Sequence, residues 1–593
     1  MRAAKDVKKK NGQFILVTDG KEDEEITNFF YYIKSDITKK FPDGTEIHMY
    51  TIRGKNKNGD HLSELIIPAQ EFESGNWVLA WGSGAVVYNK AIFNNQVRIK
   101  MLSKKNIKLE EQHEYVGFFK KNDGTLAYVS KAGCITSGRY DKSIKSCLIG
   151  KFAHYSLPAP TSRPAKLKKC IRSVLDLVTL APNNPDIGIF CCTTPIRAIL
   201  NMCIPITASH FVVGETGLKK SALVCLPQAF FGKGFYQQTQ LPAEWEDTES
   251  SLEDMSIFIR DSVLVIDDFI PTKRNAKELG SKAERVFRGA ANRTARQRSN
   301  SSGNLQHKAS PGAMIAATGE SLSLPLNGSL LKRIIFFLIE EGDLDLDVLT
   351  EYQALAEKGV LAQFTSSLIQ FLLNNSNDLE EKIESKFKKY RDKSKKELPG
   401  KVHSRVHENV ASLMISLQVL YFFAKCKNVI STGEYDRKLE TSWEQVIQLA
   451  KKQSLITDRS SLSNLLFKYL KKGLSNGEVY LGDYSTGSRP KIKNSDRLGW
   501  KKQSPQGVCI GWYDRKTKSV YIQSSEEIFN IVFNLIPEGL KKQIPSQRKK
   551  FWKDMESTGG LSSTESGRNT TRKTDPETKE SVLVYPLSPD FNF

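Results

Sequence analysis

The chain has 593 residues, of which 39% are hydrophobic and 26% are charged, as is typical of a globular protein with several domains. No segment approaches the ~20 uninterrupted apolar residues of a membrane-spanning helix, and the basic start of the chain is followed by no apolar signal sequence. The net charge of +21 favours a polyanionic partner, for which nucleic acid is the leading candidate. We therefore expect a cytoplasmic protein with no membrane partner.

The nine cysteines form no CxxC pair, and the eight histidines form no cluster of metal ligands. Adjacent Cys191 and Cys192 suit neither an ordinary disulfide nor a zinc site. His403 and His407 have helical i,i+4 spacing but lack the glutamate of a metalloprotease motif. We expect reduced, mostly buried thiols, and the sequence disfavours a metal hydrolase.

The N-terminal part of the chain is rich in short β-prone runs separated by turn residues. These runs are Phe14–Thr18, Thr45–Ile52, Trp77–Trp81 and Gly84–Tyr88. The segment Leu157–Pro164 is a plausible linker, and a helix over 165–180 and an apolar run over 187–204 follow it. We expect residues 1–160 to form a mixed α/β, β-rich accessory domain.

Beyond residue 210 the pattern alternates strand, loop and helix, which is typical of an α/β core. We expect a parallel sheet with helices over residues 165–345 and a helical lid over 346–430, in which the Lys/Glu-rich stretch 379–401 is a solvated helix face. Residues 431–593 mix strands such as Ser519–Ile522 with four predicted helices. These cover 442–455, 460–472, 525–540 and 544–556, and the polar segment 557–581 that follows is a wing or a loop.

A short apolar strand, His210–Val213, leads into the loop Gly214–Ser221, and a helix follows. A glycine turn before a helix N-terminus turns backbone N–H groups and a positive dipole end towards phosphates. The expected nucleotide ligands are Gly214, Glu215, Thr216, Gly217, Leu218, Lys219, Lys220 and Ser221. Lys220 would reach the β- and γ-phosphates and Ser221 would complete the Mg²⁺ shell. Lys219 stands where the usual GxxxxGK[ST] pattern has its second glycine.

A second apolar strand, Ser262–Ile266, ends in Asp267 and Asp268. A carboxylate at the C-terminal tip of a parallel strand beside the phosphate loop is where Mg²⁺ must be held. Asp267 suits the metal, and Asp268 suits a base that polarises the attacking water. The two motifs together predict hydrolysis of ATP or GTP.

A third strand, Ala313–Ala317, ends in Thr318, which can position the lytic water. Leu330–Arg333 then leads into another apolar strand. Arg333 is placed to face a neighbouring subunit's γ-phosphate, and a surface ion pair is the alternative role.

Between the second and third strands lies a strongly basic segment, residues 273–308, with ten Lys or Arg against two Glu. Its later half resembles a hairpin with a flexible tip around 300–304. Attached to the third strand, such a hairpin would move with nucleotide state and push on a phosphodiester backbone. The alternative is a disordered basic loop.

In this order, the phosphate loop, the strand with two aspartates, the basic hairpin, Ile315–Glu320 and Leu330–Arg333 resemble a known group. They are similar to the AAA+ ATPases of MCM-like, self-loading replicative helicases of mobile genetic elements. That group includes the staphylococcal chromosome cassette helicase and its phage and plasmid relatives. The resemblance is specific over about 205–420, and the family also lacks the second phosphate-loop glycine.

The resemblance implies roles for individual residues. Thr318 occupies the sensor-1 place, where the family usually has Asn, and Asp268 is shorter than the usual Glu. Arg333 would be the arginine finger, and Arg405 the sensor-2 arginine on the γ-phosphate. The expected DNA contacts, on the pre-sensor-1 hairpin, are Arg293, Arg296, Arg298 and Lys308. The C-terminal region would be a winged helix.

We therefore expect a ring-forming ATPase, a homo-oligomer and specifically a hexamer, that uses ATP and Mg²⁺ to translocate on single-stranded DNA. Forked DNA, origin DNA and element-encoded or host replication proteins are the expected partners. One rival is an ATP-switched origin initiator that assembles without unwinding. A fused primase is a second rival, but residues 1–160 lack the compact set of carboxylates and histidine that a primase needs.

Overall fold

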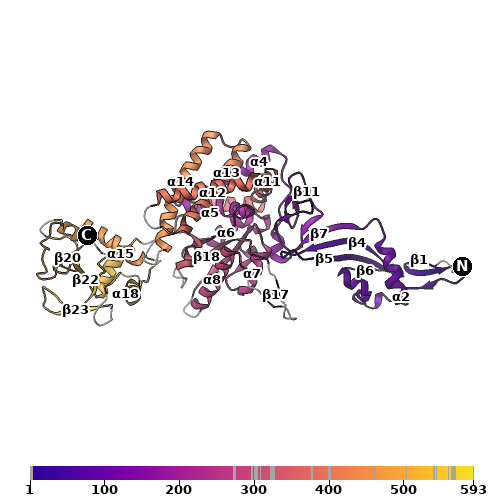
Figure 1. Cartoon of the computed structure of the whole chain (residues 1–593), viewed down its shortest axis with the longest axis horizontal. Helices are drawn as coiled ribbons and strands as arrows, with labels where there is room; N and C mark the ends of the chain where they lie inside the picture. The colour runs from indigo at the N-terminus through magenta and orange to yellow at the C-terminus, as the bar shows by residue number, and fades with distance from the viewer. Residues whose placement is uncertain are drawn as a thin grey trace.

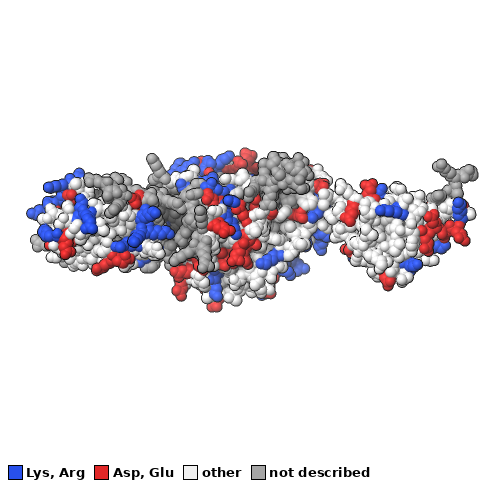
Figure 2. All heavy atoms as spheres, turned by 90° about the horizontal axis from the view of Figure 1, so that it is seen from below, with Lys and Arg blue, Asp and Glu red and all other residues white. Residues whose placement is uncertain are grey.

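The computed structural model describes most of the chain, and its gaps are short. The described residues are 5–271, 275–294, 298–299, 305–306, 309–320, 328–375, 378–398, 402–457, 461–501, 504–537, 541, 544–557, 560–562, 569–589 and 591. The molecule is elongated, with the N-terminal strands at one end, a large α/β body in the middle and the C-terminal module at the other end (Figure 1). Viewed from below, Lys and Arg gather over the C-terminal end, whereas Asp and Glu gather at the N-terminal tip (Figure 2).

The N-terminal part is β-rich, as predicted, and contains three sheets. The small sheet β1-β2-β3 consists of Lys5–Lys10, Gln13–Thr18 and Glu24–Glu25. The five-stranded sheet β12-β7-β4-β5-β6 consists of Ile144–Ser146, Lys108–His113, Phe29–Lys40, Glu46–Asn56 and His61–Pro68. The four-stranded sheet β11-β10-β9-β8 consists of Tyr140–Asp141, Gly133–Ile135, Leu126–Ser130 and Gly117–Lys120. Short helices α1 (Ala69–Ser74), α2 (Lys90–Ile92) and α3 (Arg98–Leu102) lie beside the second sheet.

Two of the predicted N-terminal strands are wrong. Trp77–Trp81 lies in the 3₁₀ segment η1 (Asn76–Gly84), which buries both tryptophan rings with their centroids 5.1 Å apart. Residues four apart meet on one side of a helical turn, whereas they would lie about 13 Å apart along a strand. The run Gly84–Tyr88 forms a single bridge, between Val87 and Thr27, and no strand.

The central body contains the predicted parallel sheet, in the order β14-β15-β18-β13-β19. These strands are Ala243–Glu244, Val263–Phe269, Met314–Gly319, Ser209–Val213 and Ile334–Leu338. Helices cover both faces of the sheet. On β13, His210 contacts Phe190 of α5 (Pro185–Ile199), while the next residue, Phe211, contacts Phe287 of α8 (Ala276–Asn292). Because successive strand side chains point to opposite faces, the two helices lie on opposite sides.

The predicted helical segments are confirmed. Before the sheet come α4 (Pro164–Leu175) and α5; within it come α6 (Lys220–Ala229), α7 (Glu249–Phe258), α8 and the short α9 (Gly328–Leu331). After it come α10 (Leu346–Glu357), α11 (Val360–Asn374), α12 (Leu379–Glu397), α13 (Ser404–Cys426) and α14 (Thr432–Thr457). Most side chains of α12 are at least partly exposed, as the Lys/Glu-rich pattern predicts.

Helix α13 is long and apolar enough to cross a membrane, but 72% of its most apolar window is buried inside the protein. Its rings and aliphatic side chains instead belong to a core that extends from Val116 to Ala450. That core joins the four-stranded sheet and α14 to the central body. It therefore crosses the sequence positions near 160 and 430 where we expected domain boundaries.

The C-terminal module has a core of its own and a five-stranded sheet, β20-β21-β22-β24-β23. Its strands are Val479–Asp483, Val508–Asp514, Ser519–Gln523, Ser581–Pro586 and Thr571–Thr574, and its helices are α15 (Ser461–Asn476), α16 (Glu526–Asn534) and α18 (Arg548–Ser557). Trp552 of α18 stacks on Tyr585 of β24, with ring centroids 4.1 Å apart. The predicted helix 544–556 corresponds to α18, and the antiparallel pair β23–β24 follows it; the winged-helix assignment stays a prediction.

Candidate nucleotide site

The loop Gly214–Lys219 connects β13 to α6 at the C-terminal edge of the sheet, with Lys220 as the first helical residue. Gly214 lies against the next strand, so that an added Cβ would stand only 2.5 Å from the Ile339 carbonyl oxygen. Gly217 adopts φ +90°, a left-handed conformation that favours glycine. The glycines therefore shape the loop so that a helix N-terminus opens onto it.

The structure explains the departure from the usual pattern at Lys219. This residue caps α6 in the left-handed conformation, with φ 58° and ψ 26°. The position thus has the backbone geometry for which the common motif uses glycine, and a side chain there costs ~1 kcal/mol or more. Lys219 keeps the shape of the loop at a cost in backbone strain.

The ammonium group of Lys220 folds back over the loop and donates a 2.6 Å hydrogen bond to the Glu215 carbonyl oxygen. Burial lowers the pKa of Lys220, and the nearby carboxylates of Glu320, Asp267 and Asp268 act in the opposite direction. The amine is therefore held at the mouth of the loop among acidic groups. Phosphate oxygens that enter the loop would meet this amine and the first N–H groups of α6.

Strand β18 lies between β13 and β15, and this order brings Thr318 between the phosphate loop and the acidic pair. The Thr318 hydroxyl donates to the Asp267 carboxylate and accepts a 3.0 Å hydrogen bond from the Asp268 N–H. Its proton is therefore used to orient Asp267. In this structure Thr318 is hydrogen-bonded to both residues of the acidic pair, whereas the sequence suggested that it positions the attacking water.

Asp268 lies within a shift of the β15–β18 register, between Ile266 and Phe269, and adopts φ 68° with an exposed side chain. Partial desolvation raises the pKa of the Asp268 carboxyl, and the negative charges of Asp267 and Glu320 raise it further. A raised pKa makes a carboxylate a better proton acceptor. The geometry and the charge environment both suit a general base.

Sequence reasoning missed Glu320, the residue that follows β18. Its carboxylate accepts a hydrogen bond from the Thr216 hydroxyl, so it connects the end of β18 to the phosphate loop. The signal was present, since an acidic residue directly after a strand at this edge must lie near the loop. Glu320 adds a third carboxylate around Lys220.

Within the described part of the chain, no cluster of three or more His, Cys, Asp or Glu could hold a metal ion by itself. Mg²⁺ at phosphate sites is usually held by one or two protein oxygens together with phosphates and water. Ser221, the second residue of α6, and Asp267 remain the candidate ligands.

Arg333 and Arg405 lie far from this loop, at the opposite end of the strands, where the parallel strands begin. Strand β19 runs parallel to β13, with Ile334 opposite Ser209 and Leu338 opposite Val213. Arg333 precedes β19, whereas the phosphate loop follows β13, and five strand residues span roughly 16 Å. Arg333 is therefore placed away from the nucleotide of its own chain.

A small group of cations surrounds Arg333. Burial lowers the pKa of its guanidinium, and the positive charges of Arg405 and Arg288 lower it further. Arg333 also donates a 3.4 Å hydrogen bond to the Asn292 side chain. Like charges close together in one surface region favour an anionic partner. Arg405, at the start of α13, thus accompanies Arg333 and not Lys220.

The predicted basic hairpin is present in part. Strands β16 (Arg298–Ser299) and β17 (Leu305–Gln306) pair antiparallel between α8 and β18. Arg296 and Lys308 lie outside the described residues, and so does the side chain of Arg298. Arg293 caps the C-terminus of α8 in the left-handed conformation, at the base of this hairpin.

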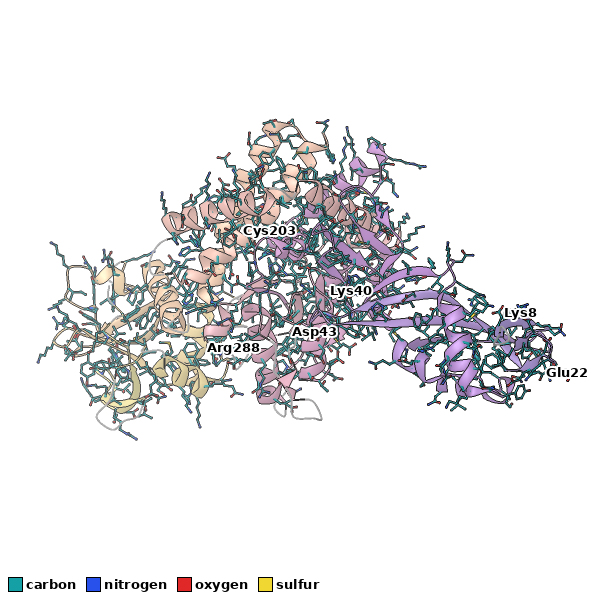
Figure 3. The ribbon with its side chains drawn as sticks, turned by 45° about the vertical axis from the view of Figure 1, so that its right-hand side comes forward. Lys8, Glu22, Lys40, Asp43, Cys203 and Arg288 are labelled. Atoms are coloured by element: carbon teal, nitrogen blue, oxygen red, sulfur yellow. The ribbon has the colours of Figure 1, made fainter. Side chains whose placement is uncertain are left out.

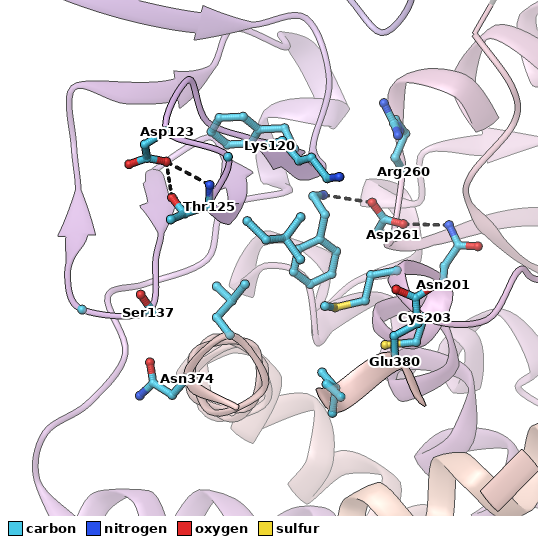
Figure 4. Close-up of a pocket in the computed structure, with 18 of the residues that line it drawn as sticks. Lys120, Asp123, Thr125, Ser137, Asn201, Cys203, Arg260, Asp261, Asn374 and Glu380 are labelled. Carbon is cyan, nitrogen blue, oxygen red and sulfur yellow. Dashed lines mark hydrogen bonds between the residues drawn. The ribbon is translucent and has the colours of Figure 1, made fainter. Parts of the chain in front are cut away.

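Arg293 lines a cavity of about 1140 Å³ at the N-terminal edge of the sheet, which Figure 4 shows in close-up. Lys120 and Arg260 also line it, from β8 and from the turn before β15. The buried Asp261 carboxylate anchors this junction by accepting hydrogen bonds from the Phe118 N–H, at 2.9 Å, and the Asn201 amide, at 2.7 Å. The cavity therefore lies at the junction between the four-stranded sheet and the strand that carries Asp267.

No protein-family model matches the chain, and no curated protein matches it. Among solved structures, the chain is similar to that of the SCCmec type IV Cch active helicase. The alignment covers 99% of this chain and 98% of that one, at 14% identity and a TM-score of 0.49. That structure is of the cassette-helicase kind that the sequence motifs resemble.

Two further structures are similar over smaller parts. The apo A form of the NrS-1 C-terminal region aligns with 71% of this chain and 88% of its own, at 9% identity and a TM-score of 0.27. A JCV helicase with a bound thiazolopyridine compound aligns with 42% of this chain and 66% of its own, at 14% identity and a TM-score of 0.22. The assignment of the site rests on its geometry and not on these likenesses.

Proposed function

We propose that the protein is an ATP-dependent DNA helicase, and that its central body is an AAA+ motor. One observation carries the proposal. At a single edge of one parallel sheet, the amine of Lys220 lies among the carboxylates of Asp267, Asp268 and Glu320, with Thr318 bonded to the acidic pair. This combination of groups suits hydrolysis of a nucleoside triphosphate.

Each of these residues has a distinct part in the proposed reaction. Lys220 and the N–H groups of the loop bind the phosphates, and Ser221 and Asp267 would hold Mg²⁺, which neutralises charge on the phosphates when bound. Thr318 fixes the orientation of Asp267. Asp268, with its raised pKa, accepts a proton from the attacking water.

The distance between the phosphate loop and the two arginines, at opposite ends of the strands, supports a ring. Arg333 and Arg405 lie together, away from the phosphate loop of the same chain. In a head-to-tail assembly they would face the nucleotide of the next subunit, where Arg333 stabilises the charge of the transition state. We propose a homo-oligomer, a hexamer, in which each active site is shared by two subunits.

Single-stranded DNA is the proposed track. The hairpin β16–β17 is attached directly to β18, the strand that carries Thr318, and its sequence is strongly basic. A change at the nucleotide would therefore move cations along the strand. Replication of a mobile element is the proposed setting, with forked and origin DNA and replication proteins as partners. The C-terminal module is proposed to act as a winged helix.

The proposal can be tested by displacement of a labelled strand from forked DNA, with ATP and Mg²⁺. Lys220→Ala is expected to abolish both ATP hydrolysis and displacement, because the phosphates lose their cation. Arg296→Ala with Arg298→Ala is expected to weaken displacement while sparing hydrolysis in the absence of DNA. Normal displacement by that double variant would refute the role of the hairpin.

The alternative is an ATP-switched origin initiator that assembles on DNA without unwinding it. The same site chemistry supports ATP binding in either case, so the motor function must be measured directly. Robust ATP hydrolysis by the unaltered chain with no strand displacement, on forks of either polarity, would favour the initiator.

A further inference from the structure

A second site lies at the N-terminal end of the molecule, remote from the central body. A cavity of about 260 Å³ opens between β1, β4 and the end of α3. Figure 3 shows Lys8, which lines this cavity, at the N-terminal end of the molecule, away from Cys203 and Arg288 in the central body. The chemistry of the cavity is set by four lysines and two partly open rings, namely Lys8, Lys9, Lys100, Lys104, Phe30 and Tyr32.

Lys8 and Lys9 come from β1, Lys100 comes from α3, and Lys104 follows that helix. Lys100 pairs with Asp6 at 3.0 Å, but in the part of the chain that the structure describes neither Lys8, Lys9 nor Lys104 makes an ion pair. Partial burial lowers the pKa of Lys9, and the charges of Lys104 and Lys55 lower it further. Mutual repulsion among these ammonium groups would be relieved by a bound anion.

The aromatic rings complete the site. The Lys9 amine lies 3.2 Å from the centroid of the Phe30 ring, and the Tyr32 side chain on the same face of β4 is 39% exposed. An exposed ring beside ammonium groups is the usual combination for a stacked base with its phosphate. The acidic strand β3 lies at the opposite edge of the small sheet from β1, so its charges do not fill the cavity.

We propose that this cavity is a second DNA site, which binds one or two nucleotides of single-stranded DNA independently of ATP. Two or three lysines would contact phosphates, and a base would stack on Tyr32. A strand held there would be presented to the central body from its N-terminal side. Binding at this site does not require hydrolysis or unwinding, so it can be tested separately from the proposed motor.

The test measures binding of the full chain to a short fluorescent oligothymidine by anisotropy, without nucleotide. All variants carry Arg296→Ala and Arg298→Ala, so that hairpin binding does not mask the result. Lys9→Glu with Lys104→Glu is expected to weaken binding about tenfold and to reduce its salt dependence, because about two phosphate contacts are lost. The matched control, Lys142→Glu with Lys151→Glu, makes the same charge change at exposed positions that do not line the cavity.

A second pair of variants keeps the proposal falsifiable if charge reversal harms folding. Tyr32→Ala is expected to weaken binding about fivefold, since base stacking is lost, whereas Tyr32→Phe retains it. Equal binding by the cavity and control double variants would overturn the proposal. So would tighter binding of a polyglutamate peptide than of the oligothymidine, because the site would then fit an acidic protein segment.

Discussion

Lys219→Gly tests the explanation of the phosphate-loop sequence. The backbone of Lys219 has φ 58° and ψ 26°, a left-handed conformation that costs a residue with a Cβ ~1–2 kcal/mol. Glycine avoids that cost but loses more freedom on folding, by roughly 0.5–1 kcal/mol. The balance predicts a net gain in the free energy of unfolding of up to about 1.5 kcal/mol.

Lys219→Ala is the matched control, because alanine removes the charged side chain but keeps the Cβ. The glycine variant should therefore be more stable than the alanine variant, by about 1 kcal/mol. In a thermal melt this difference raises the transition of the central body by about 2 °C or less. Urea unfolding followed by tryptophan fluorescence gives a second measure, since Trp245 is buried in that body. Equal stability of the two variants would refute the strain argument.

Three further predictions concern the same site. Thr318→Ala should reduce ATP hydrolysis at least tenfold, as Asp267 loses its hydrogen bond, whereas Thr318→Ser should retain most of it; equal loss in both would show that the hydroxyl is not what matters. Because burial and neighbouring carboxylates raise the pKa of Asp268, the ionised form destabilises the fold, so Asp268→Asn should stabilise the protein at neutral pH. That gain should disappear as the pH falls below the ordinary aspartate pKa of about 4, and melts across pH would check it. Mixing Arg333→Ala with Lys220→Ala chains should restore part of the ATPase activity, because some interfaces then combine an intact loop with an intact arginine; no recovery would place Arg333 outside the shared site.

Much of the central body could be predicted because its signals are local. An apolar strand followed by a glycine loop, and another followed by two aspartates, place their end residues at one edge of a parallel sheet. Glu320 was missed because our interpretation gave a role only to Thr318, although Glu320 ends the same motif, Ile315–Glu320. The contact between Glu320 and Thr216 depends on strand order, which no local pattern specifies.

The N-terminal part was harder to predict for a physical reason. Trp77–Trp81 has the apolar, aromatic composition of a strand, and only the tertiary contacts of its two indoles select a helical turn. Strand β4 was also missed, although it begins with the apolar run Phe29–Ile33; Lys34 and Asp36 interrupt the apolar pattern in its second half. The basic cavity is likewise assembled from Lys9, Phe30 and Lys104, which are distant in sequence.

The placement of Lys220 and Arg333 at opposite ends of the strands of one sheet has a consequence for how the protein would behave in a cell. Under the proposed function, a single chain contributes the phosphate loop to one active site and the arginine to another, so a monomer contains no complete active site. Its turnover per molecule would then rise with its own abundance instead of staying constant. At low protein concentration the chains would hydrolyse little ATP. Activity would begin only once enough chains were present to assemble a ring around a DNA strand.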